Sequence, residues 1–346
     1  MPWQAALPGP TGPHTLGTAS LRVRGKAEDG GFCTIAVQLW YPTDDAQALP
    51  PRAASQLVFK LRHPTWAPAW HGAQPARALG RLPLIMYVPD TSGRHDENTF
   101  MLANLASHGF VLAAIHDPFR ERTALFGLAN NSRPDSQGNS DCIARGARTA
   151  SILLNALQEL DNVGTAVWAD RLDLTNVGIM GFALGGGVAA EATHADVRYV
   201  AAANLAGPIS ARLVTVPYLV MLSELSPSNT TTNFRAPKNA RDVLSHRRAR
   251  HQAALPKSHV MEIEGAHREH FSDRLSSRWR LSAPRPAPAH KRIRTIIDAY
   301  TVAFFSTYLQ NGRHPLMCVS HSPYAEVQFA TDMPSRRIHR APAARQ

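Results

Sequence analysis

The chain has 346 residues, of which 44% are apolar and 18% are charged. This composition supports an ordinary buried core and excludes a globally disordered chain, and the length suits one large α/β domain or two small ones. The formal net charge of +11 comes from scattered arginines, without the aromatic-interleaved basic helix or zinc-finger spacing of a nucleic-acid-binding protein. We therefore expect an Arg-rich solvated surface and no specific nucleic-acid partner.

Cysteine usage and the N-terminus bear on the cellular compartment. Cys33, Cys142 and Cys318 are widely spaced and odd in number, which argues against a disulfide framework and against a metal-ligand pair. The N-terminus lacks the basic and apolar regions of a signal peptide, and no stretch approaches the roughly 18 apolar residues that a membrane span needs. We expect a cytoplasmic protein with no membrane span, no metal and no cofactor.

Hydrophobic periodicity and turn residues divide the first half of the chain into a hairpin, a surface excursion, and alternating strands and helices. In chain order we expect an irregular lead-in at residues 1–14, an antiparallel pair of strands at 15–25 and 32–42, an excursion over a sheet edge at 43–81, a buried strand at 82–88, a helix at 98–107, a strand at 110–115, a long polar loop at 117–141 and an amphipathic helix at 143–160. The long polar loop is in the right place to form the rim of a pocket.

The stretch at 176–190 organises the rest of the chain. An apolar run leads into a Gly-x-Ala-x-Gly-Gly turn, and a helix of small residues follows. This pattern predicts the strand–turn–helix of a nucleophile elbow, in which the turn is so tight that glycine must flank the central residue. A working elbow presents Ser, Cys or Asp there, whereas this chain has Ala183, whose methyl group cannot attack a substrate. The sequence therefore predicts the elbow scaffold without its nucleophile.

Beyond the elbow, apolar runs without alternation are separated by helical stretches, which indicates a mostly parallel sheet covered by helices on both faces. The expected elements are buried strands at 200–205, 218–222 and 259–263, a closing helix at 290–310 and a basic, frayed tail at 330–346. Since the chain has no internal repeat, we expect residues 15–329 to form a single α/β domain.

Several stretches together carry a resemblance to a known family. They are residues 10–18 and 37–42, residues 105–111, residues 171–190 with the elbow, and residues 299–305 and 324–329. They resemble the α/β-hydrolases related to platelet-activating factor acetylhydrolase, with dienelactone hydrolases as more distant relatives. The resemblance implies an α/β-hydrolase fold that opens with an antiparallel hairpin. It also implies an enzyme that hydrolyses small esters and lactones with a Ser-His-Asp triad.

The chain departs from the family pattern at every triad position. Where the resemblance implies the nucleophile the chain has Ala183, and where it implies the acid, after the next strand, the chain has Ala206. The base is expected in a Gly-x-x-His-x-x-Phe-x-Asp stretch, and an ungapped match places Arg268 there. His267 takes the base position only with a one-residue shift. The sequence thus predicts a degenerate triad.

The oxyanion loop is altered as well. Family members commonly carry Gly after the residue that matches Pro89, but this chain has Asp90. A carboxylate near the position where negative charge develops opposes oxyanion stabilisation. The other usual donor, the backbone N–H after the elbow residue, is retained as that of Leu184. Together with Phe182, these residues define the expected pocket and oxyanion region.

Other polar residues are possible substitutes for the missing groups. His116 follows a strand at the end that faces the expected pocket, and it is either a packing residue or an acid/base group. His267 and His270 are either surface residues or site residues. Ser92 fits a turn, and Glu224 orients nothing without a nucleophile. A metal site at His267, Glu269 and His270 is disfavoured, because neighbouring loop side chains rarely converge on one ion.

Two classes of function follow from these residues. We expect a non-catalytic pseudo-hydrolase that binds a small hydrophobic, ester-like or lactone-like ligand, or a protein partner that the sequence does not identify. The alternative is a repurposed lyase, isomerase or cyclase on such a metabolite, with Asp90, His116 or His267 as acid/base groups. A carboxylic-ester hydrolase with unusual catalytic residues is less favoured. A cleft beside Ala183 that is filled by Phe182 and Arg268 would favour the non-catalytic class.

Overall fold

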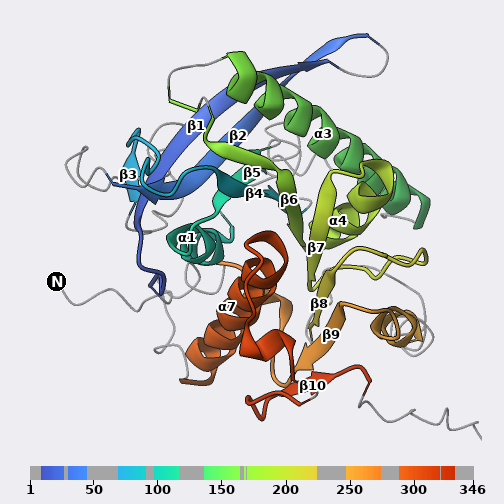
Figure 1. Ribbon diagram of the computed structural model, residues 1–346. Helices are drawn as coiled ribbons and strands as arrows, with labels where there is room; N and C mark the ends of the chain where they lie inside the picture. The colour runs from blue at the N-terminus through green and yellow to red at the C-terminus, as the bar shows by residue number, and fades with distance from the viewer. Residues whose placement is uncertain are drawn as a thin grey trace, which may run out of the picture.

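The computed structural model describes residues 9–26, 30–44, 69–90, 97–116, 136–163, 167–168, 170–223, 247–273, 288–319 and 321–331. Within these ranges the chain forms a ten-stranded sheet with the strand order β10-β9-β8-β7-β6-β4-β5-β2-β1-β3 (Figure 1). In the central run β5-β4-β6-β7-β8-β9, each strand pairs in parallel with its neighbours. The pairs β1 with β2, β2 with β5, and β9 with β10 are antiparallel. The expected mostly parallel sheet with an N-terminal antiparallel hairpin is confirmed.

The elements have the following bounds. The strands are β1 (Thr15–Lys26), β2 (Phe32–Thr43), β3 (Ala69–His71), β4 (Leu82–Val88), β5 (Val111–His116), β6 (Leu172–Phe182), β7 (Tyr199–Leu205), β8 (Tyr218–Leu222), β9 (Ser258–Ile263) and β10 (Val327–Phe329). The helices are α1 (Thr99–Ser107), α3 (Ser136–Val163), α4 (Leu184–Ala195) and α7 (Pro288–Leu309), with the short 3₁₀ turns η1 (Arg268–Phe271) and η2 (Pro315–Met317).

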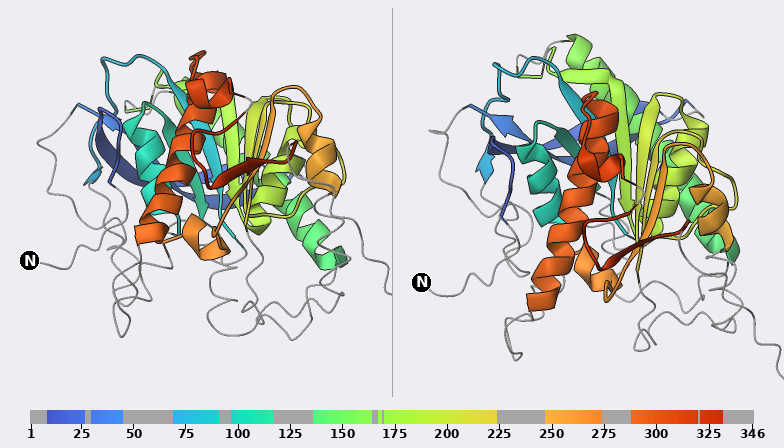
Figure 2. Two further views of the ribbon diagram at one scale, coloured as in Figure 1. Left: turned by 90° about the horizontal axis from the view of Figure 1, so that it is seen from below. Right: turned by 60° about the horizontal axis from the view of Figure 1, so that its bottom comes forward.

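Two hydrophobic cores lie on the two faces of the sheet. One core joins the sheet to α1 and α7, and the other joins it to α3 and α4 (Figure 2). Successive residues of a strand point to opposite faces, so on β6 Ile179 belongs to the α3/α4 core and Met180 to the α1/α7 core. This arrangement places the C-terminal ends of β4, β6 and β7 along one edge of the sheet, where α/β folds gather their sites.

Local sequence explains the character of the strands. All seven residues of β4 are buried, as expected for a central strand that is covered on both faces. On β1, by contrast, Arg22, Arg24 and Lys26 are exposed while Val23 is buried. This alternation is typical of an antiparallel strand with one solvated face.

Several details differ from the sequence-based expectation. The helix expected at 143–160 begins earlier, at Ser136, inside the expected loop at 117–141. The sequence did not indicate this start because the first residues of the helix are polar and show no apolar periodicity. The three-residue strands β3 and β10 were not expected, since three residues are too short for a period-2 pattern. The strand β3 pairs with β1 at the sheet edge, within the expected excursion. Most of the expected tail, residues 332–346, lies outside the described residues.

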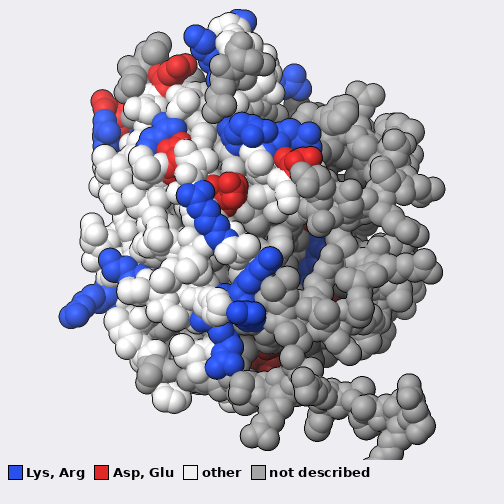
Figure 3. Space-filling model, turned by 90° about the vertical axis from the view of Figure 1, so that its right-hand side faces the viewer, with Lys and Arg blue, Asp and Glu red and all other residues white. Residues whose placement is uncertain are grey.

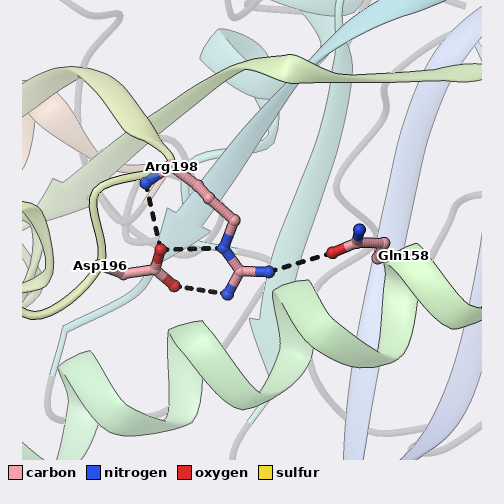
Figure 4. A network of polar contacts seen from close by, with 3 residues as sticks. All are labelled: Gln158, Asp196 and Arg198. Atoms are coloured by element: carbon pink, nitrogen blue, oxygen red, sulfur yellow. Dashed lines mark hydrogen bonds and ion pairs between the residues drawn. The ribbon is translucent and has the colours of Figure 1, made fainter.

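The turn between α4 and β7 shows how the opposite edge of the sheet is held together. The Arg198 guanidinium donates to both carboxylate oxygens of Asp196, at 2.9 Å and 2.6 Å, and to Gln158 Oε1 on α3 at 3.2 Å (Figure 4). Such a bidentate pair fixes geometry as well as adding energy. It ties the turn to α3 at the edge opposite the elbow, so this network has a structural role.

The described surface carries charges of both signs. On the face shown in Figure 3, Lys and Arg side chains are interspersed with Asp and Glu side chains. Cys33, Cys142 and Cys318 are all free thiols. Among the described residues, no helix has the length and apolar character needed to cross a bilayer.

Candidate functional site

Ala183 lies at the tip of the strand–turn–helix formed by β6 and α4. Its backbone angles are φ 53° and ψ −121°, a conformation that is sparsely populated by residues other than glycine and costs on the order of 1–3 kcal/mol. Its N–H donates to Leu205 O at 2.8 Å, and its carbonyl accepts from Gly186 N–H at 2.9 Å. The turn is therefore fixed by hydrogen bonds to β7 and to the first turn of α4.

Two glycines are needed in the elbow because of close backbone contacts. A Cβ atom at Gly181 would lie 1.9 Å from Gly185 O, and a Cβ atom at Gly185 would lie 2.2 Å from Val88 O. Both distances are far below van der Waals contact, so a side chain at either position would force the backbone apart. The glycine spacing that identified the elbow thus reflects packing of the turn against itself and against the end of β4.

Ala206 follows β7 and lies beside the elbow. Its φ angle is also positive, 54°, and its N–H donates to Met221 O at 2.9 Å. A Cβ atom on the next residue, Gly207, would lie 2.2 Å from Ala183 O. The two alanines that replace polar residues in the resemblance therefore lie on adjacent turns at the same edge of the sheet.

Asp90 and Arg268 form an ion pair at this edge, although they are 178 residues apart in the sequence. The Nη2 atom of Arg268 donates to Asp90 Oδ2, and Leu184 N–H donates to Asp90 Oδ1 at a long distance of 3.4 Å. Only 5% of the Asp90 side chain is exposed, compared with 33% of the Arg268 side chain. The Asp90 carboxylate is thus buried beside the elbow and is held by donors from η1 and from the start of α4.

Phe182 completes the packing around the guanidinium. The central carbon of the Arg268 guanidinium lies 5.6 Å from the centroid of the Phe182 ring, within the range of a cation–π contact. Phe182 itself is only 1% exposed. Arg268 therefore contacts both the ring before the elbow residue and the carboxylate after β4.

His267 and His270 face each other instead of Asp90. His267 N–H donates to His270 Nδ1 at 3.0 Å, and the ring of His270 lies 4.7 Å from that of His290. Burial, followed by the charge of His290, lowers the pKa of His270 to about 4. Within the described part of the chain, Nδ1 of His267 has no hydrogen-bond partner. Arg268, and not His267, is the residue of this loop that bonds Asp90.

Buried charges that the sequence analysis did not single out anchor the same loop. Asp273 accepts hydrogen bonds from the N–H and the hydroxyl of Thr99, at 2.9 Å and 2.5 Å, and burial raises the pKa of Asp273 to about 6. Arg294 of α7 donates to Ser272 O at 2.5 Å. Burial also raises the pKa of Asp298 well above its usual range. The sequence contained a signal for this cluster that was not used: Arg294 and Asp298 lie among the apolar residues on the buried side of α7.

Of the remaining expected site residues, Pro89 lies at the elbow and His116 does not. His116 ends β5, which is separated from β6 by β4, and it pairs in register with Ala36 of β2. At about 4.8 Å per strand, it is therefore roughly 10 Å from the elbow strand. Pro89 borders the elbow, since a Cβ atom at Gly185 would lie 2.7 Å from its carbonyl oxygen. Ser92 and Glu224 lie outside the described residues.

The described residues show no metal site, and the cavity that they enclose lies away from the elbow. No group of three or more His, Cys, Asp or Glu among the described residues is arranged to hold a metal ion. A small apolar cavity lies on the α3 side of the sheet, where Leu84, Leu157 and Trp168 help to line it. These lining residues belong to the α3/α4 core, so the cavity is a packing void away from Ala183.

Comparison with known proteins addresses the fold. No protein-family model and no curated protein sequence matches the chain. Among solved structures, a ferulic acid esterase from Streptomyces cinnamoneus aligns with 93% of this chain and 98% of that chain, with a TM-score of 0.66 and 20% sequence identity. This chain has the α/β-hydrolase fold. Because one fold supports many activities, a likeness at this identity establishes the architecture alone.

Proposed function

We propose that this α/β-hydrolase-fold chain is a non-catalytic pseudo-hydrolase that uses its elbow region to bind a ligand. The observation that carries the proposal is the Arg268–Asp90 ion pair beside Ala183. This pair places two charged side chains that bond each other beside the elbow. We infer that the chain is related to the acetylhydrolases and dienelactone hydrolases that it resembles, and that Ala183, Ala206 and Arg268 stand at the degenerate triad positions.

The side chains at these three positions offer no route to acyl transfer. The methyl groups of Ala183 and Ala206 are neither a nucleophile nor an acid. The guanidinium of Arg268 presents five N–H donors and no acceptor, so it cannot act as a base toward a hydroxyl group. Triad members act as a unit, and loss of the nucleophile alone costs on the order of 10⁶-fold in one characterised hydrolase. Acyl transfer at this site would therefore need a nucleophile other than the residue at position 183.

The donor that a hydrolase of this fold offers to a substrate oxygen is engaged by the protein itself. Leu184 N–H, which follows the elbow residue, bonds Asp90 Oδ1 at 3.4 Å. A carboxylate at this place repels the negative charge that develops on a substrate oxygen during acyl transfer. The oxyanion region therefore opposes the chemistry that the fold commonly supports.

A repurposed lyase, isomerase or cyclase is the alternative, and it needs an acid and a base that converge on one space. The Asp90 carboxylate is already bonded to Arg268 and Leu184. The backbone of His267 bonds His270, and His116 is on the second strand from β6. Among the described residues, no histidine bonds Asp90 to form the acid–base pair that this alternative requires. We therefore propose the non-catalytic function.

The proposal is tested by assaying the purified chain for ester hydrolysis and covalent labelling. We expect no hydrolysis of p-nitrophenyl acetate or butyrate above a buffer blank, and no labelling by a fluorophosphonate probe. An Arg268→Gln variant purified in parallel is the control, since a contaminating esterase would give both samples the same rate. Stoichiometric labelling of a single residue would reveal an active nucleophile and would refute the proposal.

A further inference from the structure

The Asp90 side chain is held in the way that a bound carboxylate ligand is held. One carboxylate oxygen accepts from the Arg268 guanidinium, and the other accepts from Leu184 N–H at 3.4 Å. A guanidinium presents a planar fork of donors that matches a carboxylate. The Asp90 side chain is only 5% exposed, whereas 33% of the Arg268 side chain is exposed, so Arg268 is the more accessible partner of the pair.

We propose that Arg268 and Leu184 N–H form a binding site for a small monocarboxylate, and that Asp90 occupies this site as a tethered ligand in the free protein. This inference deepens the proposed function, on which it rests, by naming the chemical class of the ligand. The ligand carboxylate takes the place of the Asp90 carboxylate on Arg268.

The side chains around the ion pair suit an anion. Ala183 and Ala206 directly follow the adjacent strands β6 and β7 and carry no charge. A carboxylate at either position would repel a second anion on Arg268. The Phe182 ring, 5.6 Å from the guanidinium carbon, adds an apolar wall. Among the described residues, the carboxylate that bonds the Arg268 guanidinium is that of Asp90.

Tethering sets the condition for binding to the natural chain. An intramolecular ligand acts at an effective concentration in the millimolar range or above, so a free acid must exceed this concentration or make further contacts. Simple acetate at low millimolar concentration therefore does not displace Asp90 from the natural chain. Removing the tethered group exposes the site to free carboxylates.

Two variants vacate the site by different amounts. Asp90→Gly removes a CH₂–COO⁻ group, which is the size of acetate, and Asp90→Ala removes only the carboxylate, which is the size of formate. We expect acetate to raise the Tm of Asp90→Gly saturably and formate to do so for Asp90→Ala. Neither anion should raise the Tm of the natural chain at the same concentrations. Calorimetric titration then gives the Kd of each pair.

Matched controls separate a carboxylate site from a general salt effect. Acetamide has the shape of acetate without its charge, and it should give no shift with Asp90→Gly. In the double variant Asp90→Gly/Arg268→Gln, the affinity for acetate should fall roughly tenfold or more, because the charged donor is lost. Three results would overturn the carboxylate site. The first is an equal Tm shift with acetate and acetamide, and the second is an unchanged affinity for acetate in the double variant. The third is a folded Asp90→Gly or Asp90→Ala variant whose Tm responds to neither acetate nor formate.

The anion titrations and the esterase assay test the carboxylate site and the non-catalytic function separately. A natural chain that hydrolyses no ester, but whose Asp90→Gly variant does not respond to acetate, refutes the carboxylate site alone. A natural chain that hydrolyses p-nitrophenyl esters refutes the non-catalytic function, whatever acetate does to the variants. The two single variants also keep the test decisive if one of them fails to fold.

Discussion

Ala183 and Ala206 directly follow the adjacent parallel strands β6 and β7, and both have positive φ angles, 53° and 54°. Backbone strain of this kind persists in proteins when the surrounding structure over-determines it, and it clusters at functional sites. In this chain the strain at Ala183 remains, although its methyl side chain presents no reactive group. The elbow geometry is therefore maintained by packing of the turn and not by the chemistry of its central residue.

The strain at Ala183 predicts an unusual response to glycine. Ala183→Gly relieves roughly 1–3 kcal/mol of strain, and this gain is offset by about 0.5–1 kcal/mol of chain entropy and about 0.8 kcal/mol for the buried methyl. We expect a free energy of unfolding between about 1 kcal/mol below and about 2 kcal/mol above that of the parent. The control Ala189→Gly, at a buried helical position, should cost about 2 kcal/mol. Urea denaturation measures both, and equal losses would contradict the strain.

The Asp90–Arg268 pair predicts strong coupling in a double-mutant cycle. Arg268→Gln leaves the buried Asp90 carboxylate without its cation, and we expect a loss of roughly 2–4 kcal/mol, discounted because Arg268 is partly exposed. Asp90→Asn/Arg268→Gln should cost less than the sum of the single changes, with a coupling energy of about 1–3 kcal/mol.

The ion pair of Arg81 with Asp170, whose side chains are 52% and 81% exposed, is the matched control for this cycle. Arg81→Gln should change the free energy of unfolding by no more than about 0.5 kcal/mol, as is usual for a surface pair. Strictly additive single and double variants at Asp90 and Arg268 would show that the buried pair is energetically independent.

Restoring catalysis should require several changes at once. Ala183→Ser alone should barely raise the hydrolysis of p-nitrophenyl acetate, since Arg268 stands at the base position and cannot accept the serine proton. Adding Ala206→Asp, Arg268→His and Asp90→Gly should raise the rate at least roughly tenfold over Ala183→Ser, and more than the separate effects predict, because triad members act as a unit. The readouts are initial rates and fluorophosphonate labelling of residue 183. A single Ala183→Ser variant as active as the quadruple variant would argue against this assignment of positions.

His270 should make stability depend on pH. Its pKa is about 4 in the folded protein, where burial and His290 disfavour its charge, against an ordinary value of 6.5. The unfolded chain therefore binds a proton between these values that the folded chain does not. The contribution of His270 is fully present above pH 6.5 and is lost as the pH falls towards 4, by about 3 kcal/mol.

Asp273 acts in the opposite direction. Its pKa is raised from 3.8 to about 6, so its contribution is present below pH 3.8 and is lost as the pH rises through 6. In the parent the two contributions oppose each other over nearly the same pH range. His270→Gln should therefore gain stability as the pH falls from 6 to 4, while Asp273→Asn should lose more stability over that range than the parent does. Urea denaturation at pH 4, 5, 6 and 7 measures these slopes. Parallel pH profiles for the parent and both variants would exclude the two groups as the cause.

The sequence by itself determined the elements whose pattern is local. The strand expected at 82–88 coincides with β4, and the strand expected at 218–222 coincides with β8, because continuous apolar runs between turn residues require burial on both faces. The elbow was also found from the sequence, since its glycine spacing is a local pattern and Gly181 is needed by a contact with Gly185, four residues along the chain. The contact of Gly185 with Val88 O, by contrast, appears only in the tertiary structure.

Only the tertiary structure decided what faces Ala183. The choice between His267 and Arg268 depended on a single residue of register in a loop, and local patterns do not determine loop register. The partner of Asp90 lies 178 residues away, and no periodicity links the end of β4 to η1. The ion pair exists because the folded sheet brings these two segments to one edge and buries the Asp90 carboxylate, which then requires a cation as its partner.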